Sequence, residues 1–155
     1  PTFRTIRECL NSKDMNFFLK IKLIIHTVSL HRKINKIKNI KKNILIHNDM
    51  ALNNILILND EVVLIDFEDS MFIKDWILVD ITDLYYFYET FSEEVVFEEL
   101  QLISRKLNLE LTDEELYLHA KFGKLRSLIR ITLFNRESAD RKKEALNELR
   151  KFKND

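Results

Sequence analysis

Residues 44–69 read ILIHNDMALNNILILNDEVVLIDFED, and this stretch decides the fold. It contains two short runs rich in Ile, Leu and Val, at residues 54–58 and 61–66. The pair Asn59-Asp60 between them tolerates the backbone angles of a tight turn, so the two runs predict an antiparallel hairpin. Residues 44–46 predict one further short strand ahead of it.

Outside this stretch the sequence predicts helices. Before it, apolar residues at helical spacing predict one long helix from Asp14 to about His31, with a broad buried face. The predicted face comprises Phe17, Phe18, Ile21, Ile24, Ile25 and Val28. Beyond Ser70 the whole chain is predicted to be helical, with helices at residues 80–91, 92–107 and 112–134. A last amphipathic helix presents Leu146, Leu149 and Phe152 on one side. Thr112 and Glu115 have the spacing of a capping box. The expected fold class is α+β, mostly α: a helical body with one small hairpin.

Composition narrows the possible functions. The chain has 155 residues, 46% of them hydrophobic and 32% charged, which is typical of one folded domain. Its 25 Lys and Arg balance 25 Asp and Glu, so net charge gives no argument for a nucleic-acid partner or for binding to an anionic membrane.

Several kinds of site and segment are excluded by what the sequence lacks. It contains no uninterrupted run of about 18 apolar residues, so no membrane span is predicted. Gly123 is the only glycine, which excludes glycine-rich phosphate loops. Cys9 is the only cysteine, which excludes an internal disulfide, and we expect a cytoplasmic setting.

Four polar residues in the stretch have a spacing that suits phosphoryl transfer. His47 and Asp49 are two positions apart, Asn54 follows Asp49 by five residues, and Asp66 closes the second run of the hairpin. Transfer to a hydroxyl needs a carboxylate that orients the attacking oxygen and takes its proton, a role that Asp49 suits. Magnesium prefers oxygen ligands and keeps several waters, so Asn54 and Asp66 suffice as its protein ligands. The hairpin would return Asp66 to the neighbourhood of Asn54.

The pattern HxDxxxxN followed by IDFE on a strand resembles the catalytic core of the protein-kinase-like superfamily. It is most similar to the small-molecule branch, which contains aminoglycoside phosphotransferases and choline or ethanolamine kinases, with lipopolysaccharide sugar kinases as close relatives. The resemblance implies an enzyme that uses ATP and Mg²⁺ to phosphorylate a hydroxyl of a small polar acceptor. By it, Asp49 is the catalytic aspartate, Asn54 and Asp66 are the magnesium ligands, His47 braces the loop, and Asp80 is the buried aspartate that packs against it. It covers residues 14–91, and residues 92–155 would form a helical region that shapes the acceptor site.

Departures from the protein-kinase pattern favour a small-molecule kinase. Asn48 stands where protein kinases have an arginine, and Glu68 stands where they have a flexible glycine. Only 46 residues precede His47 and they read as mostly helical, so we expect the β-rich nucleotide lobe to be absent from this chain. The chain would then be a C-terminal lobe, completed by an N-terminal lobe in cis or in trans, and we expect little or no activity from it in isolation.

Several other groups allow two interpretations. Glu68 and Asp69 could contact a cationic acceptor, or they could be loop carboxylates and helix caps. An aromatic group could form a cation–π site, although core packing is the favoured interpretation. Its members are Trp76, Tyr85, Tyr86, Phe87, Tyr88 and Phe91. Lys121, Lys124, Arg126 and Arg130 could face an anionic substrate, but a solvated helix face is favoured.

Two rival functions remain open at this point. The six Lys and Arg of residues 31–42 could bind RNA with steep salt dependence, although a solvated surface turn or helix end is favoured and we expect no nucleic-acid partner. The chain could also be a non-catalytic pseudo-kinase or a helical interaction module. The joint presence of His47, Asp49, Asn54 and Asp66 argues against that alternative, because a scaffold has no need for a metal pair.

Overall fold

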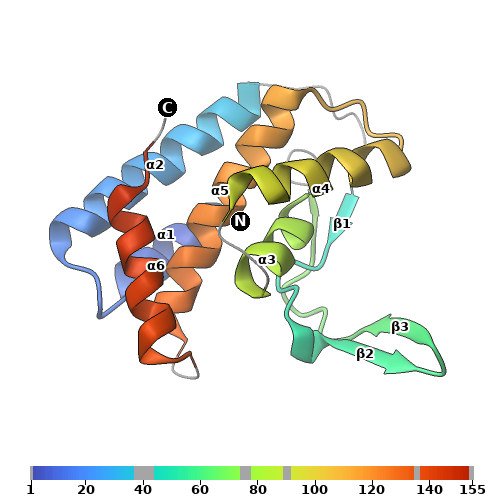
Figure 1. Ribbon diagram of the computed structural model, residues 1–155, viewed down its shortest axis with the longest axis horizontal. Coiled ribbons are helices and arrows are strands. Elements are labelled where there is room, and N and C mark those ends of the chain that lie inside the picture. Colours follow the sequence, from blue (N-terminus) through green and yellow to red (C-terminus); the bar gives the residue numbers. More distant parts are fainter. Residues whose placement is uncertain (1, 37–43, 74–77, 89–91, 135–136, 154–155) are drawn as a thin grey trace.

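The protein is mostly helical, with two small antiparallel sheets, as shown by a computed structural model that describes residues 2–36, 44–73, 78–88, 92–134 and 137–153. Figure 1 shows the helices gathered into one body, from which the β2–β3 hairpin projects to one side. The helices are α1 (Thr2–Asn11), α2 (Phe17–Lys36), α3 (Val79–Tyr88), α4 (Glu93–Lys106), α5 (Asp113–Leu133) and α6 (Ala139–Lys151). The strands are β1 (Ile44–Ile46), β2 (Ile55–Leu58), β3 (Glu61–Leu64) and β4 (Met71–Ile73), and a 3₁₀ turn, η1 (Leu52–Asn54), precedes β2. The expected α+β, mostly α class is confirmed.

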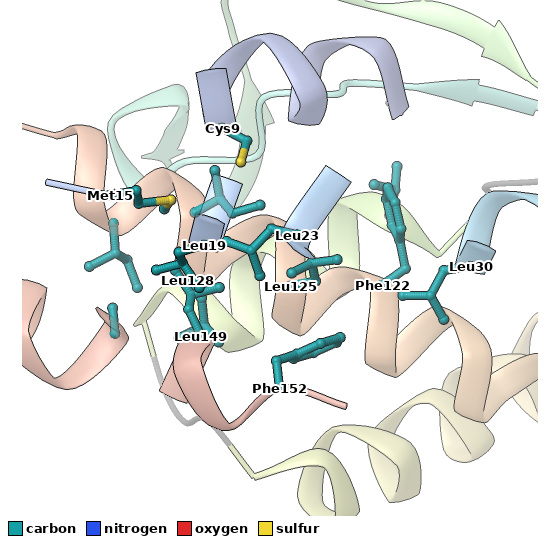
Figure 2. Close-up of a cluster of buried hydrophobic side chains, with 14 of the residues drawn as sticks. Cys9, Met15, Leu19, Leu23, Leu30, Phe122, Leu125, Leu128, Leu149 and Phe152 are labelled. Atoms are coloured by element: carbon teal, nitrogen blue, oxygen red, sulfur yellow. The ribbon is translucent and has the colours of Figure 1, made fainter. Parts of the chain in front are cut away.

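Helix α5 is the centre of the body. It contacts five other helices, α1, α2, α3, α4 and α6, and residues on nearly all of its sides are buried. The predicted capping box starts it: the Thr112 backbone N–H donates to Glu115 Oε2 at 2.6 Å, and the Glu115 N–H donates to Thr112 Oγ1 at 3.2 Å. One hydrophobic cluster joins α5 to α1, α2 and α6, and Figure 2 shows its side chains meeting between those helices. A second cluster joins α5 to α3 and α4.

Gly123 allows α3 and α5 to approach closely. A β-carbon at this position would meet Thr82 Cγ2 at 3.0 Å and lie still closer to Thr82 Cβ and Oγ1. In a solvated helix, Gly→Ala gains about 1 kcal/mol. Here we expect Gly123→Ala to lower the free energy of unfolding by about 1–3 kcal/mol, because overpacking outweighs propensity. Urea denaturation measures this, and adding Thr82→Gly should recover part of the loss. A gain in stability from Gly123→Ala alone would contradict the close packing.

The predicted hairpin is confirmed. Strands β2 and β3 pair antiparallel, with Leu58 opposite Glu61 across a two-residue turn. Asn59 and Asp60 both have left-handed backbone angles, with φ of 51° and 64°, which the favoured hairpin turn requires. Strand β1 is also present where it was predicted.

Two predictions about the strands and their surroundings are wrong. The chain beyond Ser70 is not entirely helical, because β4 follows directly and pairs with β1, with Leu45 opposite Phe72. The structure therefore contains two two-stranded sheets rather than one hairpin. A three-residue strand is too short to show a period in sequence, and its partner lies 27 residues earlier.

The predicted buried face of the long N-terminal helix is also wrong. Helix α2 runs to Lys36, so the start of the basic stretch is a helix end as favoured, and residues 37–42 of that stretch lie outside the described residues. Its buried residues are Leu19, Leu23, Thr27, Leu30 and Ile34. Phe17, Phe18, Ile21 and Ile25 are exposed instead. Apolar residues surround most of this helix, so periodicity alone could not select the side that packs.

The remaining helix predictions are confirmed within one or two residues where the structure describes them. Helices α3, α4 and α5 match the predictions at 80–91, 92–107 and 112–134, and residues 89–91 lie outside the described residues. In α6, Leu149 and the following Phe152 are buried and Leu146 is partly buried against the core. Within the described ranges, no helix is long and apolar enough to cross a bilayer.

Candidate active site

The loop from β1 to η1 carries the predicted catalytic residues, and Asp80 anchors it. Asp80, in the first turn of α3, accepts hydrogen bonds from the backbone N–H groups of His47 at 2.6 Å and Asn48 at 2.7 Å. Burial, together with the charge of nearby Asp83, raises the pKa of Asp80 although these two hydrogen bonds oppose the shift. Asn48 itself has a left-handed backbone with φ of 64°. The contact predicted for Asp80 is therefore present.

His47 connects the same loop to the end of the hairpin. Its Nε2 lies 2.7 Å from the carbonyl oxygen of Ile65, and its ring centroid is 4.8 Å from that of Phe67. Since the carbonyl can only accept, Nε2 carries the proton in this contact. His47 is itself almost fully buried. This geometry suits the predicted bracing role, because the histidine spans the two residues that flank Asp66.

Asp49 lies between an amide and two arginines. Asn54 Nδ2 donates to the Asp49 carbonyl at 3.0 Å and lies 3.3 Å from Asp49 Oδ2. Oδ1 accepts from Arg4 Nη2 at 3.2 Å and from Arg130 Nη2. Burial raises the pKa of Asp49, but the charges of Arg130, Arg4 and Arg126 outweigh it and lower the pKa below its usual value. The carboxylate is therefore ionised at neutral pH. Its Oδ1 accepts from two arginines, whereas its Oδ2 accepts only the 3.3 Å contact from Asn54 among the hydrogen bonds described above.

The pairing of β2 with β3 brings the backbone of Asp66 close to that of Asn54. The Ile65 N–H donates to the Asn54 carbonyl at 3.0 Å, one step beyond the last β2–β3 pair. Asp66 follows with a φ of 62° and is exposed. Asn54 is buried, and its amide nitrogen donates to Asp49, so its Oδ1 is the atom that could face a cation; in this structure Oδ1 accepts from Asn53 Nδ2 at 3.3 Å. In the described part of the chain, no three His, Cys, Asp or Glu residues form a group that could hold a metal. A site built on Asn54 and Asp66 would depend on water and phosphate oxygens for its other ligands.

Two arginines of α5 that the sequence favoured as solvated, Arg126 and Arg130, are buried. Arg126 is 0% exposed, and its Nη2 donates to the Asn48 carbonyl at 2.9 Å and lies 3.1 Å from Asp83 Oδ2. Arg130 Nη1 lies 3.1 Å from the same Asp83 oxygen. The favoured solvated helix face is therefore wrong for Arg126 and Arg130, and also for Lys121, which is buried. The signal was present in the sequence: Leu, Ile and Phe occur on most sides of the helix around these residues, which leaves little room for a solvated face.

Arg4 of α1 is a residue of this site that sequence reasoning missed. Its Nη1 donates to the Asn48 carbonyl at 3.0 Å and to Asp69 Oδ2 at 2.7 Å, while its Nε donates to Glu8 at 3.0 Å. The Arg4 guanidinium also contacts Asp49, so it connects the catalytic loop to the segment that follows Asp66. No feature of the sequence around Arg4 indicates this role. Asp69, a predicted acceptor contact, is paired with Arg4 instead of standing free, and Glu68 is exposed.

We expect Arg4→Gln to loosen the segment after Asp66. Its ion pairs are partly exposed, so their loss should lower the free energy of unfolding by only about 1 kcal/mol. Amide hydrogen exchange at Ser70, whose N–H bonds to the Phe67 carbonyl at 3.0 Å, should become faster. Arg7→Gln is the matched control, since Arg7 is exposed on the same helix. Equal exchange at Ser70 in the two variants would contradict the role of Arg4.

A pocket of about 600 Å³ opens beside Asp49. It is lined by Asp49, Met50, Ala51, Asn53, Asp83, Phe87, Arg130, Leu133, Phe134 and Glu137. The rings of Phe87 and Phe134 meet edge to face with centroids 5.5 Å apart. Of the predicted aromatic group, Tyr86 is buried in the core and Phe87 lines the pocket, whereas Trp76, Phe91 and the side chain of Tyr88 lie outside the described residues. Glu68 and Asp69 do not line this pocket.

Three other residues with titratable side chains, His119, His26 and Cys9, do not line this pocket. His119 is buried, and desolvation lowers its pKa to about 4, so it is neutral at pH 7. His26 packs its ring 5.7 Å from that of Phe152. Cys9 is buried, and burial raises its pKa to about 11, which makes it a poor nucleophile. None of the three residues is among those that line the pocket beside Asp49.

Comparison with known protein families supports the resemblance seen in the sequence. The sequence model of the phosphotransferase enzyme family matches residues 30–103, a span that contains His47, Asp49, Asn54, Asp66 and Asp80. A search of curated proteins found no match. The family match supports a place in the protein-kinase-like phosphotransferase superfamily, and with it a general phosphotransferase activity.

Proposed function

We propose that this chain carries the catalytic loop of an ATP-dependent phosphotransferase that moves the γ-phosphoryl group to a hydroxyl of a small polar acceptor. The observation that carries this proposal is the position of Asp49. Its carboxylate is ionised, contacts the amide of Asn54 on one side, and opens on the other side to a pocket of about 600 Å³. An acceptor hydroxyl in that pocket can donate its hydrogen bond to Oδ2, which orients the attacking oxygen and receives its proton.

In this proposal Asn54 Oδ1 and the Asp66 carboxylate hold Mg²⁺. The two residues fit the ion in kind, because both present hard oxygen atoms and the hairpin fixes their backbones side by side. The bound ion would neutralise charge on the phosphate oxygens. Arg130 and Arg4 do not replace it, since both guanidiniums are already paired with carboxylates.

The charged and aromatic side chains that line the pocket already have partners. Its carboxylates are paired with arginines: Asp49 with Arg130, Asp83 with Arg126 and Arg130, and Glu137 with Arg141. The guanidinium carbons of Arg141 and Arg130 lie 5.4 Å and 5.7 Å from the ring centroids of Phe87 and Phe134. The charge of the lining therefore does not select one acceptor class. The proposed acceptors, which are aminoglycosides, choline, ethanolamine and sugars, follow from the resemblance of the catalytic loop.

We also propose that the nucleotide is held in part by a lobe outside these 155 residues, in cis or in trans. Support comes from apolar side chains that the hairpin and its neighbours expose to solvent. They are Leu45, Ile57, Leu58, Val62, Phe67 and Phe72. Apolar surface of this kind marks a binding interface in a folded protein. A nucleotide-binding lobe resting there would lie over the proposed metal site at the base of the hairpin.

An assay with ATP, Mg²⁺ and a panel of hydroxylated amines and sugars tests the proposal. We expect turnover when the chain is joined to its nucleotide-binding lobe, and little or none from the 155-residue chain alone. Robust turnover by the chain alone would overturn the need for a further lobe. No phosphorylation of any acceptor by the completed enzyme, together with no ATP hydrolysis, would overturn the proposed activity.

A further inference from the structure

The outer face of α2 has an apolar half and a basic half. The buried residues of this helix follow one another at intervals of three or four positions and face the body. A second stripe with the same spacing lies on the opposite side. It consists of Phe17, Phe18, Ile21, Ile25, Val28, Ser29, Arg32 and Lys36. Its first five residues are apolar. Its only charged residues, Arg32 and Lys36, are basic and lie at its C-terminal end.

Large apolar side chains on this stripe stand in solvent. Phe18 is 81% exposed, Phe17 is 70% exposed and Ile25 is 61% exposed. Figure 1 shows α2 along one edge of the helical body. A shallow groove of about 540 Å³ continues from the apolar part to the basic part, lined by Ile24, Ile25, Val28, Ser29, Arg32, Lys33 and Lys36. A contiguous apolar surface with a charged border is typical of a binding face.

Charge is segregated onto this helix. The whole chain is neutral, yet α2 contains five Lys and Arg and no Asp or Glu, so the rest of the chain carries a formal net charge of −5. Lys20 and Lys22 are engaged with the body, because each donates to a backbone carbonyl at 2.8 Å. Arg32 and Lys36 are exposed on the stripe. The face thus offers cations beside an apolar strip, with no acidic residue on the helix to balance them.

We propose that the outer face of α2 binds the surface of a membrane that contains anionic phospholipids. The helix lies in the plane of the membrane. Its apolar half enters the boundary between headgroups and acyl chains, as interfacial amphipathic helices do. Arg32 and Lys36 meet the lipid phosphates, and each basic residue near an anionic surface contributes about 1 kcal/mol.

Two other occupants complement this face less well. A second copy packed in parallel would place Arg32 and Lys36 against the same residues of its partner. A copy packed antiparallel would bury those two cations against Phe17 and Phe18, where residues 9–36 offer one carboxylate, Asp14, for both. A nucleic acid would satisfy the cations but would leave the exposed phenylalanines in water. An anionic membrane satisfies both halves at once.

Vesicle flotation tests the proposal without any need for turnover. We expect the chain to float with vesicles of phosphatidylglycerol and phosphatidylcholine at low salt, and to stay in solution with phosphatidylcholine alone. The double variant Arg32→Gln/Lys36→Gln should bind about 25-fold more weakly, at about fivefold per charge. Phe18→Ser/Ile25→Ser should lose at least about tenfold. Leu102→Ser on α4, 46% exposed, is the matched control and should float like the unchanged chain.

Each of the following results would overturn the proposal: no flotation with the anionic vesicles, equal flotation with neutral ones, or flotation that the α2 variants leave unchanged. A dimer seen by sedimentation and abolished by Phe18→Ser/Ile25→Ser would assign the face to a second copy instead. Circular dichroism would check that the variants remain folded, which we expect because the substituted side chains are exposed. Vesicle binding does not depend on turnover, so failure of the proposed phosphotransferase activity would leave the flotation result unchanged.

Discussion

Asp49→Asn, made in the completed enzyme, should lower kcat by about 10²–10⁴-fold, the usual contribution of a positioned general base. The substitution keeps the shape of the side chain and its contact with Asn54. It removes the negative charge that Arg4 and Arg130 now balance, and with it the oxygen that can accept the proton of the acceptor hydroxyl. KM for the acceptor should change much less than kcat, because the loss occurs in the transition state. Steady-state kinetics with saturating ATP and Mg²⁺ measure both parameters.

The matched control is Asp60→Asn, which removes an exposed carboxylate at the hairpin turn. It should leave kcat within about twofold of the unchanged enzyme. Equal turnover by the Asp49→Asn enzyme would remove Asp49 from the role of base. It would also favour the alternative of a non-catalytic module, for which the paired Asp49 would be a structural ion pair only.

Asp83→Ala should lower the free energy of unfolding by about 3–5 kcal/mol, the largest stability effect that we expect. Asp83 is 1% exposed, and its Oδ2 lies 3.1 Å from both Arg126 and Arg130. Removal of the Asp83 carboxylate leaves the buried guanidiniums of Arg126 and Arg130 with less negative charge to balance them. Burial already lowers the pKa of Arg126, and Asp83 is the largest charge that opposes this shift. Chemical denaturation at pH 7 gives the change directly.

Two further variants separate charge balance from loss of volume. Glu98→Ala, on the exposed side of α4, should change stability by no more than about 0.5 kcal/mol. Adding Arg126→Met to Asp83→Ala should recover part of the loss, because one uncompensated charge is removed while the side-chain volume is kept. A double variant that is still less stable than Asp83→Ala would show that Arg126 stabilises the fold mainly through Asn48.

Features that depend on neighbouring residues could be predicted from the sequence. The hairpin follows from Asn59-Asp60 and its flanking aliphatic runs, and the start of α5 follows from the spacing of Thr112 and Glu115. The contact between Asp80 and the catalytic loop came from the family resemblance rather than from composition. The roles of Asp49, Asn54 and Asp66 remain predictions, although the structure brings Asp49 and Asn54 into contact.

Features that depend on distant packing could not be predicted. Strand β4 exists because β1 lies beside it, and a run of three residues carries no period of its own. The side of α2 that packs is chosen by α5 and α1, since apolar residues occur all around the helix. Arg4 and Arg130 reach Asp49 across 45 and 81 positions of sequence. The buried arginines of α5 were open to inference from their apolar surroundings, whereas Arg4 was not.

The most direct measurement is an anomalous difference map of the completed enzyme crystallised with a non-hydrolysable ATP analogue and Mn²⁺. We predict a Mn²⁺ peak bonded to Asn54 Oδ1 and to the Asp66 carboxylate, with a phosphate oxygen in the same shell and Asp49 beside the γ-phosphate. A Mn²⁺ peak that contacts neither residue, or a nucleotide bound away from the base of the hairpin, would contradict the proposed phosphotransferase site.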